Sequence, residues 1–120
     1  MANKININEK LALFNDYFNP RIIAALNDSH VKLVKFKGEF IWHHHENVDE
    51  LFIIIKGHMK IETKDGVIEL DEGELVVIPK NVEHKPFAEE EVHIMLIEPI
   101  GTINTGNVQN NRTRSEIEFI

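Results

Sequence analysis

Nine short segments of strand-forming residues follow one another between Arg21 and Pro99, and turn residues separate them. They are rich in Ile, Val and Phe and lie at residues 22–26, 31–37, 40–45, 50–56, 58–64, 67–70, 74–78, 82–87 and 92–98. No helical pattern interrupts this succession. It therefore predicts an all-β domain, an antiparallel sandwich or barrel, and excludes alternating βαβ units.

Two of the turns are distinctive. The pair Asp65-Gly66 between two strand patterns predicts a type I′ hairpin, in which both turn residues need a positive φ. The acidic run Glu89-Glu90-Glu91 is interpreted as the turn that separates the last two strands.

The segments outside the strands are short. Residues 1–20 are interpreted as a lead-in with one or two helical turns, because Leu11, Phe14 and Phe18 recur at helical spacing. Asn8 is the predicted cap of this helix and Pro20 its end. Residues 21–100 form the predicted barrel, and residues 101–120 a loop or tail that ends in a weak strand. A chain of 120 residues corresponds to one domain.

Charge and composition exclude several classes of function. A net charge of −7 argues against a nucleic-acid-binding protein, since such proteins rely on Lys and Arg. Cysteine is absent, so the chain has neither disulfides nor thiolate chemistry. Apolar runs reach about five residues, far below the ~20 that cross a bilayer, and the first 20 residues lack a signal-peptide core. We therefore expect a soluble, cytoplasmic protein with no membrane partner.

The histidines are the candidate functional residues. His43 and His45 are two apart, so on a strand both imidazoles point to one face, whereas His44 points to the other. Glu50 returns after a short loop and His84 lies on a later strand, so both can reach the same volume. Three imidazoles and one carboxylate suit a divalent transition metal. A solvated stretch of surface histidines is the competing interpretation, and spacing alone does not decide between them.

Two motifs resemble those of the cupin superfamily. The first, G-x5-H-x-H-x3-4-E-x6-G, matches Gly38, His43, His45, Glu50 and Gly57, with one residue fewer after the first glycine. The chain is similar in particular to small single-domain bacterial cupins, some of which are labelled mannose-6-phosphate isomerase-like. We do not carry that label over, because a shared barrel does not fix a reaction.

The second motif, G-x5-P-x-G-x2-H-x3-N, matches Gly73, Pro79 and His84. Asn81 replaces its middle glycine and Ala88 its final asparagine. Asparagine tolerates a positive φ better than other non-glycine residues, so we expect Asn81 to preserve the local backbone. Neither replacement removes a metal ligand.

The resemblance implies a jelly-roll barrel whose interior holds one divalent metal (Fe, Mn, Ni, Zn or Co). Its ligands would be His43, His45, Glu50 and His84. If the ion is octahedral, two positions remain for water, substrate or O₂. The implied partner is a small, anionic or chelating molecule.

Three hypotheses for function follow from this resemblance. The first is a metal-dependent enzyme with dioxygenase, isomerase or lyase chemistry, the second a non-catalytic binding or sensing module, and the third a barrel with a purely structural metal. An enzyme needs an acid or base near the metal, and His93 and Glu98 are the candidates, although alternation does not show which of them faces inward.

The expected assembly is a homodimer. Residues 51–55 are apolar at every position, so both faces of this strand must be covered. The barrel interior covers one face, and the lead-in or a second copy covers the other. Trp42 and Phe40 are predicted to lie on the outer face and to contribute to the contact.

Overall fold

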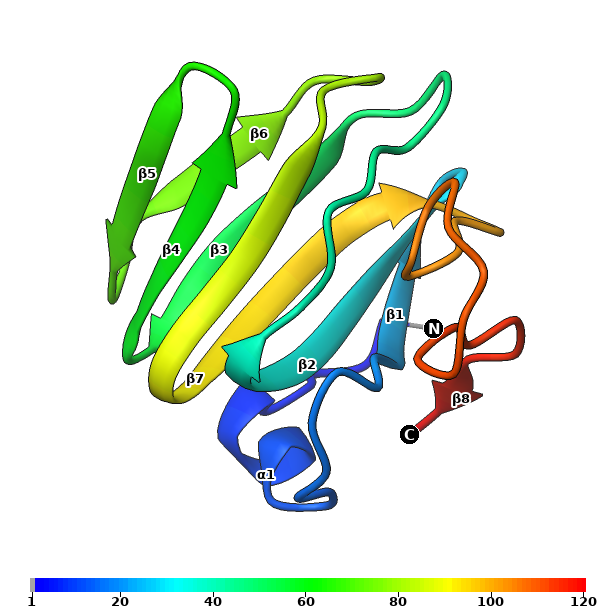
Figure 1. The fold of residues 1–120 in the computed structure, drawn as a ribbon. Helices are drawn as coiled ribbons and strands as arrows, with labels where there is room; N and C mark the ends of the chain where they lie inside the picture. Colours follow the sequence, from blue (N-terminus) through cyan, green and yellow to red (C-terminus); the bar gives the residue numbers. More distant parts are fainter. Residues whose placement is uncertain (1) are drawn as a thin grey trace.

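The computed structural model describes residues 2–120, and within them eight strands form one strongly bent sheet (Figure 1). The sheet order is β5-β4-β7-β2-β1-β8, and β3 pairs with both β6 and β7. The strands are β1 (Arg21–Leu26), β2 (Ser29–Glu39), β3 (Glu50–Lys56), β4 (His58–Thr63), β5 (Gly66–Asp71), β6 (Leu75–Ile78), β7 (His84–Pro99) and β8 (Glu118–Phe119). The all-β prediction is confirmed. No helix within residues 2–120 has the length and apolar character needed to cross a membrane.

Alternating side chains of the strands build an inner core. On β3, Phe52 and Ile54 are buried, whereas the alternate residues Leu51, Ile53 and Ile55 are only half-buried. Met59 and Ile61 on β4 are fully buried in the same core. One face of each strand thus points into the bend of the sheet, as period-two alternation requires.

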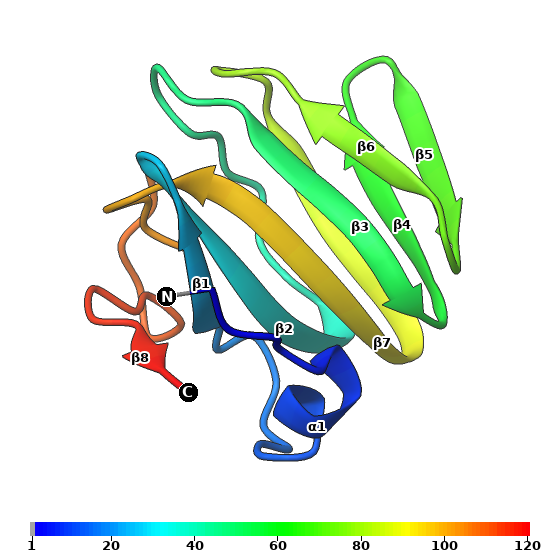
Figure 2. The same cartoon turned by 180° about the vertical axis from the view of Figure 1, so that it is seen from behind.

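A second apolar cluster lies on the outer side of the sheet. Figure 2 shows the N-terminal segment crossing in front of β1 and β2, on the side of the sheet that faces the viewer there, before it forms α1 (Ile7–Leu11). Leu11 and Phe14 pack there against Ile23 and Leu33. The buried Lys35 holds this segment against the sheet, because its Nζ donates to the carbonyls of Leu11 at 2.8 Å and Phe14 at 2.6 Å. The predicted lead-in therefore covers part of the outer face.

The predicted cap of this helix is wrong. Asn6, rather than Asn8, caps α1, because its Oδ1 accepts a hydrogen bond from the Glu9 backbone N–H at 2.9 Å. The helix ends at Leu11, well before Pro20. Phe18 leaves the helical face altogether and packs in the inner core.

The last two predicted strands are one strand. β7 runs from His84 to Pro99 and bends where Glu89-Glu90-Glu91 was predicted to form a turn (Figure 1). Its register with β2 shifts between Phe36 and Gly38, so β7 carries extra residues at the bend. The three glutamates are exposed there but keep strand geometry. A bulge of this kind bends a strand without ending it.

Residues 40–45 do not form the predicted strand. They are extended, but within the described chain they pair with a strand at one position only, the isolated bridge between His43 and His84. The alternation is interrupted along this segment, so Phe40 is buried in the inner core instead of lying outside. Trp42 is exposed, as predicted.

The hairpin between β4 and β5 forms, but its turn differs from the prediction. Lys64 and Asp65 are the turn residues, and neither has a positive φ. The positive φ falls on Gly66, which pairs with Thr63 as the first residue of β5. The Thr63 hydroxyl donates to the Gly66 carbonyl at 3.0 Å. The turn therefore lies one residue earlier than predicted, and it is not of type I′.

The C-terminal segment forms a loop and then the short strand β8, which pairs in parallel with β1. The loop approaches the histidine segment at Gly106, where φ is +56°. A Cβ at this position would lie 2.2 Å from the His44 carbonyl oxygen. Asn107 completes the contact, because its N–H donates to the same oxygen at 3.0 Å. The predicted tail is thus part of the wall around the histidines.

Candidate metal centre

Four side chains predicted as metal ligands come together inside the bend of the sheet. Glu50 opens β3 and His84 opens β7, while His43 and His45 project from the extended segment beside them. Their ligand atoms all lie within 4.8 Å of one another. Glu50 Oε1 is 3.3 Å from His45 Nε2 and 3.5 Å from His84 Nε2.

Backbone carbonyls orient two of the imidazoles. His43 Nδ1 lies 2.9 Å from the Ile41 carbonyl oxygen, and His84 Nδ1 lies 2.9 Å from the Val82 carbonyl oxygen. Because a carbonyl only accepts, each Nδ1 carries the proton and each Nε2 keeps its lone pair. This is the arrangement that fixes metal-binding histidines in many proteins. Reciprocal backbone hydrogen bonds between His43 and His84 hold the two residues side by side.

Asn81 fixes the position of His45. Its φ is +66°, and its backbone N–H donates to the His45 carbonyl at 2.9 Å. The prediction that Asn81 can stand where the motif has glycine is confirmed, because asparagine adopts the left-handed conformation there.

The ligand atoms are buried without partners. His45 Nε2, His84 Nε2 and Glu50 Oε1 have no hydrogen-bond partner among residues 2–120. All four residues are at most 5% exposed. A buried polar atom without a partner is costly, so a converging set of such atoms indicates a bound group. Imidazole nitrogens and a carboxylate oxygen fit a divalent transition metal.

Electrostatics keep these groups ready to bind a cation. Burial, and next the neighbouring His84, lower the pKa of His43 to about 4, so this imidazole is neutral near pH 7. Burial alone would raise the pKa of Glu50, but the neighbouring His45 and His84 side chains, whose Nε2 atoms lie 3.3 Å and 3.5 Å from Oε1, hold it well below its ordinary value. The site thus offers a neutral imidazole and a carboxylate rather than their protonated forms.

The other histidines lie away from the cluster. His44 turns outward as predicted, and its Nδ1 lies 2.8 Å from Glu83 Oε1. His93 also faces outward, with its Nε2 at 2.6 Å from Glu91 Oε2, so it is not an acid or base of the site. His58 is exposed beside Asp71.

Glu98 is the candidate acid or base that faces inward. It is 2% exposed and forms an ion pair with Lys32, whose Nζ lies 2.8 Å from Glu98 Oε1. Burial, and next the charge of Glu50, raise the pKa of Glu98 well above its ordinary value despite Lys32. Sequence reasoning missed Lys32. Its signal would have been a lysine inside an apolar strand, two residues before Val34 on the same face.

Two cavities adjoin the cluster. The first has room for about one water, at about 20 Å³. His43, Glu50 and Asn104 are its polar residues, and Phe18, Pro20, Phe36, Phe40, Phe52, Pro86 and Leu96 form the rest of its wall. Phe18 has a φ of +61°, which is rare for a bulky residue, and its ring lies 4.8 Å from that of Phe36. A strained aromatic residue thus closes the apolar side of the site.

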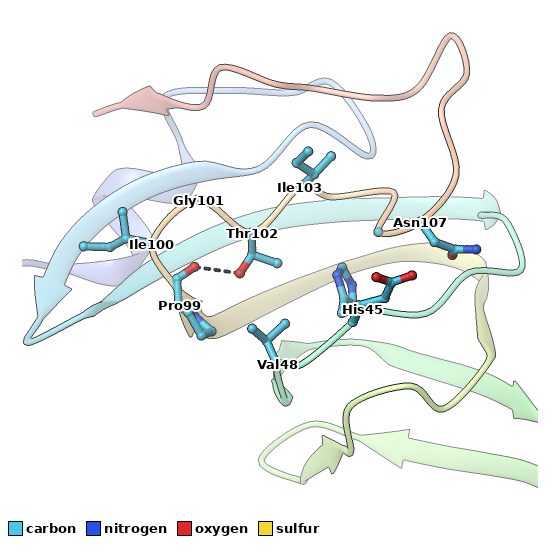
Figure 3. A pocket seen from close by; sticks show the side chains of 10 residues that line it. His45, Val48, Pro99, Ile100, Gly101, Thr102, Ile103 and Asn107 are labelled. Atoms are coloured by element: carbon cyan, nitrogen blue, oxygen red, sulfur yellow. Dashed lines mark hydrogen bonds between the residues drawn. The ribbon is translucent and has the colours of Figure 1, made fainter.

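The second cavity is an open pocket of about 400 Å³ on the other side of His45. Figure 3 shows His45 and Val48 facing Pro99, at the end of β7, and Thr102 of the C-terminal loop across this pocket. Asn107 lies at its end near His45. The pocket is large enough for a small organic molecule.

Comparisons with known proteins agree with this geometry. A cupin-2 domain protein from Shewanella frigidimarina has a similar crystal structure, with a TM-score of 0.78 and 54% identity over 79% of this chain and 93% of that one. Protein NMB1881 from Neisseria meningitidis has a TM-score of 0.75 and 34% identity over 81% of this chain and 99% of that one.

Relatives of known sequence match a shorter stretch. The uncharacterized protein YdbB of Bacillus subtilis is 41% identical over 64 residues, which are 52% of this chain and 57% of YdbB. Acireductone dioxygenase of the same bacterium is 29% identical over 80 residues, which are 62% of this chain and 45% of that enzyme. The chain thus spans about half the length of these relatives.

The family model of the cupin domain matches residues 30–98, which include all four clustered side chains and most of the sheet. The predicted jelly-roll fold is confirmed by this match and by the similar crystal structures. The chain belongs to the cupin family.

Proposed function

We propose that His43, His45, Glu50 and His84 hold one divalent transition metal, and that the protein is an enzyme acting on a small chelating molecule there. The observation that carries this proposal is the set of converging, buried ligand atoms without partners. Such a metal supplies Lewis acidity and, if it is iron, a binding site for O₂.

The residues around the centre define the kind of ligand. One divalent ion and Glu50 give a net charge near +1, and the ion pair of Lys32 with Glu98 adds none. A molecule with a single negative charge and two oxygen donors neutralises this site. The open pocket beside His45 admits such a molecule, whereas the small phenylalanine-lined cavity beside His43 and Glu50 has room for about one water.

The similarity to acireductone dioxygenase supports an enediol as the substrate class and dioxygenation as the reaction. Enediols conjugated with a carbonyl group lose one proton readily and present two adjacent oxygens, which match the charge and the donor requirement above. Isomerase and lyase reactions on related enolic compounds need the same metal and the same pocket.

The experiment is a substrate screen with anaerobically purified protein loaded with Fe²⁺. O₂ uptake is measured with enediol and catechol compounds. We expect uptake that needs both the compound and the metal and that disappears in Glu50→Ala. His44→Ala is the matched control and keeps the activity, because His44 faces away from the site. No metal-dependent uptake and no change in any compound would contradict the enzyme proposal.

A non-catalytic binding module is the second candidate. This candidate is favoured because His93 faces outward. Glu98 is then the inward-facing candidate acid or base, and it is engaged in an ion pair with Lys32. Calorimetry with the Ni²⁺-loaded protein distinguishes the two. A binding module binds an enediol and returns it unchanged, whereas an enzyme converts it.

A further inference from the structure

The small cavity beside His43 and Glu50 lies apart from the open pocket. Its volume is about 20 Å³, whereas the open pocket beside His45 has about 400 Å³. The two cavities share no lining residue among residues 2–120, and they adjoin different members of the four-residue cluster. The organic compound proposed above fits only the open pocket. The small cavity is therefore a second, separate approach to the proposed metal.

Aromatic rings give this small cavity an apolar wall. The rings of Phe18, Phe36 and Phe40 pack together, with centroids 4.8 Å apart for Phe18 and Phe36 and 5.2 Å apart for Phe18 and Phe40. Phe52 and Leu96 line the cavity from β3 and β7. Phe18 keeps its place at a φ of +61°, a conformation that costs energy for a bulky residue. The fold thus accepts backbone strain to place this ring in the wall.

The polar groups of the small cavity leave few partners for a water, which needs roughly two to four of them when buried. The Asn104 amide is engaged, because its Nδ2 donates to the Arg112 carbonyl at 2.9 Å and its Oδ1 accepts from the Arg114 N–H at 2.7 Å. His43 Nδ1 is engaged with a backbone carbonyl. The groups left are His43 Nε2 and the Glu50 carboxylate, which the proposed metal occupies. With the metal bound, the cavity favours a small apolar molecule over water.

O₂ is a molecule of this kind, and dioxygenation requires it at the metal. It is apolar and uncharged, so its transfer from water into an apolar cavity is favourable. The small cavity adjoins two of the four proposed ligands, so a molecule inside it lies next to the metal position. A cavity costs stability, because the atoms of its wall lose packing contacts, and a core that served stability alone would fill it. A site for O₂ accounts for its size, its apolar wall and its place.

We propose that the small cavity is a binding site for O₂, which reaches the proposed metal from the phenylalanine side while the organic compound enters through the open pocket. This inference rests on the proposed function and deepens it, because it assigns the two reactants of a dioxygenation to two separate cavities. Phe36 and Leu96 line the small cavity and not the open pocket. Substitutions at these two positions therefore change the volume of the proposed O₂ site and leave the walls of the open pocket as they are.

Xenon and O₂ test the site without any reaction. Both are applied to the Zn²⁺-loaded protein, because Zn²⁺ has no redox chemistry. Crystals under xenon pressure should show a xenon atom in the small cavity, since apolar protein cavities bind xenon. In solution, dissolved O₂ is paramagnetic and should increase the NMR relaxation rate of the Phe52 ring protons several times more than that of the Phe14 ring protons. Solvent exposure alone would give the reverse, because Phe14 is 8% exposed and Phe52 2%.

Two variants change the volume of the small cavity in opposite directions. Leu96→Phe fills it, so the xenon density and the faster relaxation of Phe52 should be lost. Phe36→Leu enlarges it, so both effects should increase. Ile94→Phe is the matched control, because Ile94 is buried on the same face of β7 but does not line the cavity. It overpacks the same core and should leave both effects in place. With a compound that supports O₂ uptake, Leu96→Phe should raise the KM for O₂ and not the KM for the compound.

A wild-type protein with no xenon in the small cavity and no faster relaxation of Phe52 would overturn the inference and leave the metal site intact. Unchanged xenon density in Leu96→Phe would overturn it as well. If Leu96→Phe does not fold, the wild type and Phe36→Leu decide, and equal effects in these two proteins would contradict the proposed site. Xenon and O₂ in the cavity of a protein that shows no metal-dependent O₂ uptake would support the gas site and contradict the proposed dioxygenation.

Discussion

At the scale of single residues, the burial of His43 has a consequence for stability. Its pKa is lowered to about 4 by burial and by His84, whereas the unfolded chain titrates near the ordinary value of 6.5. Between these values the unfolded chain binds a proton that the folded chain does not. The contribution of His43 to the free energy of unfolding is therefore fully present above pH 6.5. It is lost as the pH falls towards 4, by about 3 kcal/mol in total.

Urea unfolding of the metal-free protein between pH 7 and pH 4 tests this prediction. Glu98 has the opposite effect on the pH dependence of stability, because burial and the charge of Glu50 raise its pKa. Its contribution to the free energy of unfolding is lost as the pH rises above the ordinary pKa of a glutamate. The difference between wild type and His43→Gln isolates His43. An identical pH dependence in the two proteins would show that His43 does not titrate as its burial requires.

At the scale of elements, Gly106 decides how closely the C-terminal loop approaches the site. Gly106→Ala brings a Cβ to 2.2 Å from a backbone oxygen of His44 and adds the strain of a positive φ. We expect a loss of about 2 kcal/mol or more in the free energy of unfolding, and weaker metal binding because the histidine segment moves.

Gly101→Ala is the matched control for this prediction. Gly101 lies in the same loop with a φ of +91°, but nothing lies within 4 Å of its added Cβ. It should show the strain of the positive φ alone and keep its metal affinity. Equal losses in both variants would mean that the contact with His44 has no effect.

The sequence patterns predicted the faces of some residues correctly and those of others wrongly. The alternation of His43, His44 and His45 gave the correct faces although no strand forms, because any extended backbone turns successive side chains to opposite sides. It failed for Phe40, since no ladder maintains the alternation between residues 40 and 43. The alternation of side chains therefore predicts which face a residue occupies over two or three positions, but not beyond a point where strand pairing is interrupted.

The candidate site shows the same limit. The cupin motifs predicted the four clustered residues, because the motif encodes long-range proximity that spacing alone does not. Whether Glu98 or His93 faces inward could not be derived, since both faces of that strand are apolar and covered. Lys32 was missed, because its partner Glu98 is 66 residues away in the sequence.

At the scale of the whole molecule, an apolar face remains uncovered on β3 and β6. Leu75 is 56% and Val77 46% exposed on β6, which forms an edge of the sheet. They pair with the half-buried Ile53 and Leu51 of β3. The lead-in covers Ile55 on the same strand but not these residues. We therefore predict a homodimer through this face, without the contribution expected from Phe40.

Light scattering at low micromolar concentration tests the dimer. The expected mass is twice the 13.9 kDa of one chain. Leu75→Lys/Val77→Lys should give the mass of a single chain, because two charges cannot be buried at the contact. Val67→Lys alters an equally exposed residue on β5 and should leave the dimer intact. A single-chain mass for the wild type would contradict the prediction.

The most direct test of the central claim is the metal content of the purified protein. We expect about one divalent transition metal per chain in wild type, and loss of most of it in His45→Ala and in His84→Ala, because the Nε2 atoms of these two residues have no partner within residues 2–120. His44→Ala should keep the metal, because its ring contacts Glu83 instead. Equal metal loss in all three variants, or a wild-type protein that takes up no metal, would contradict the account.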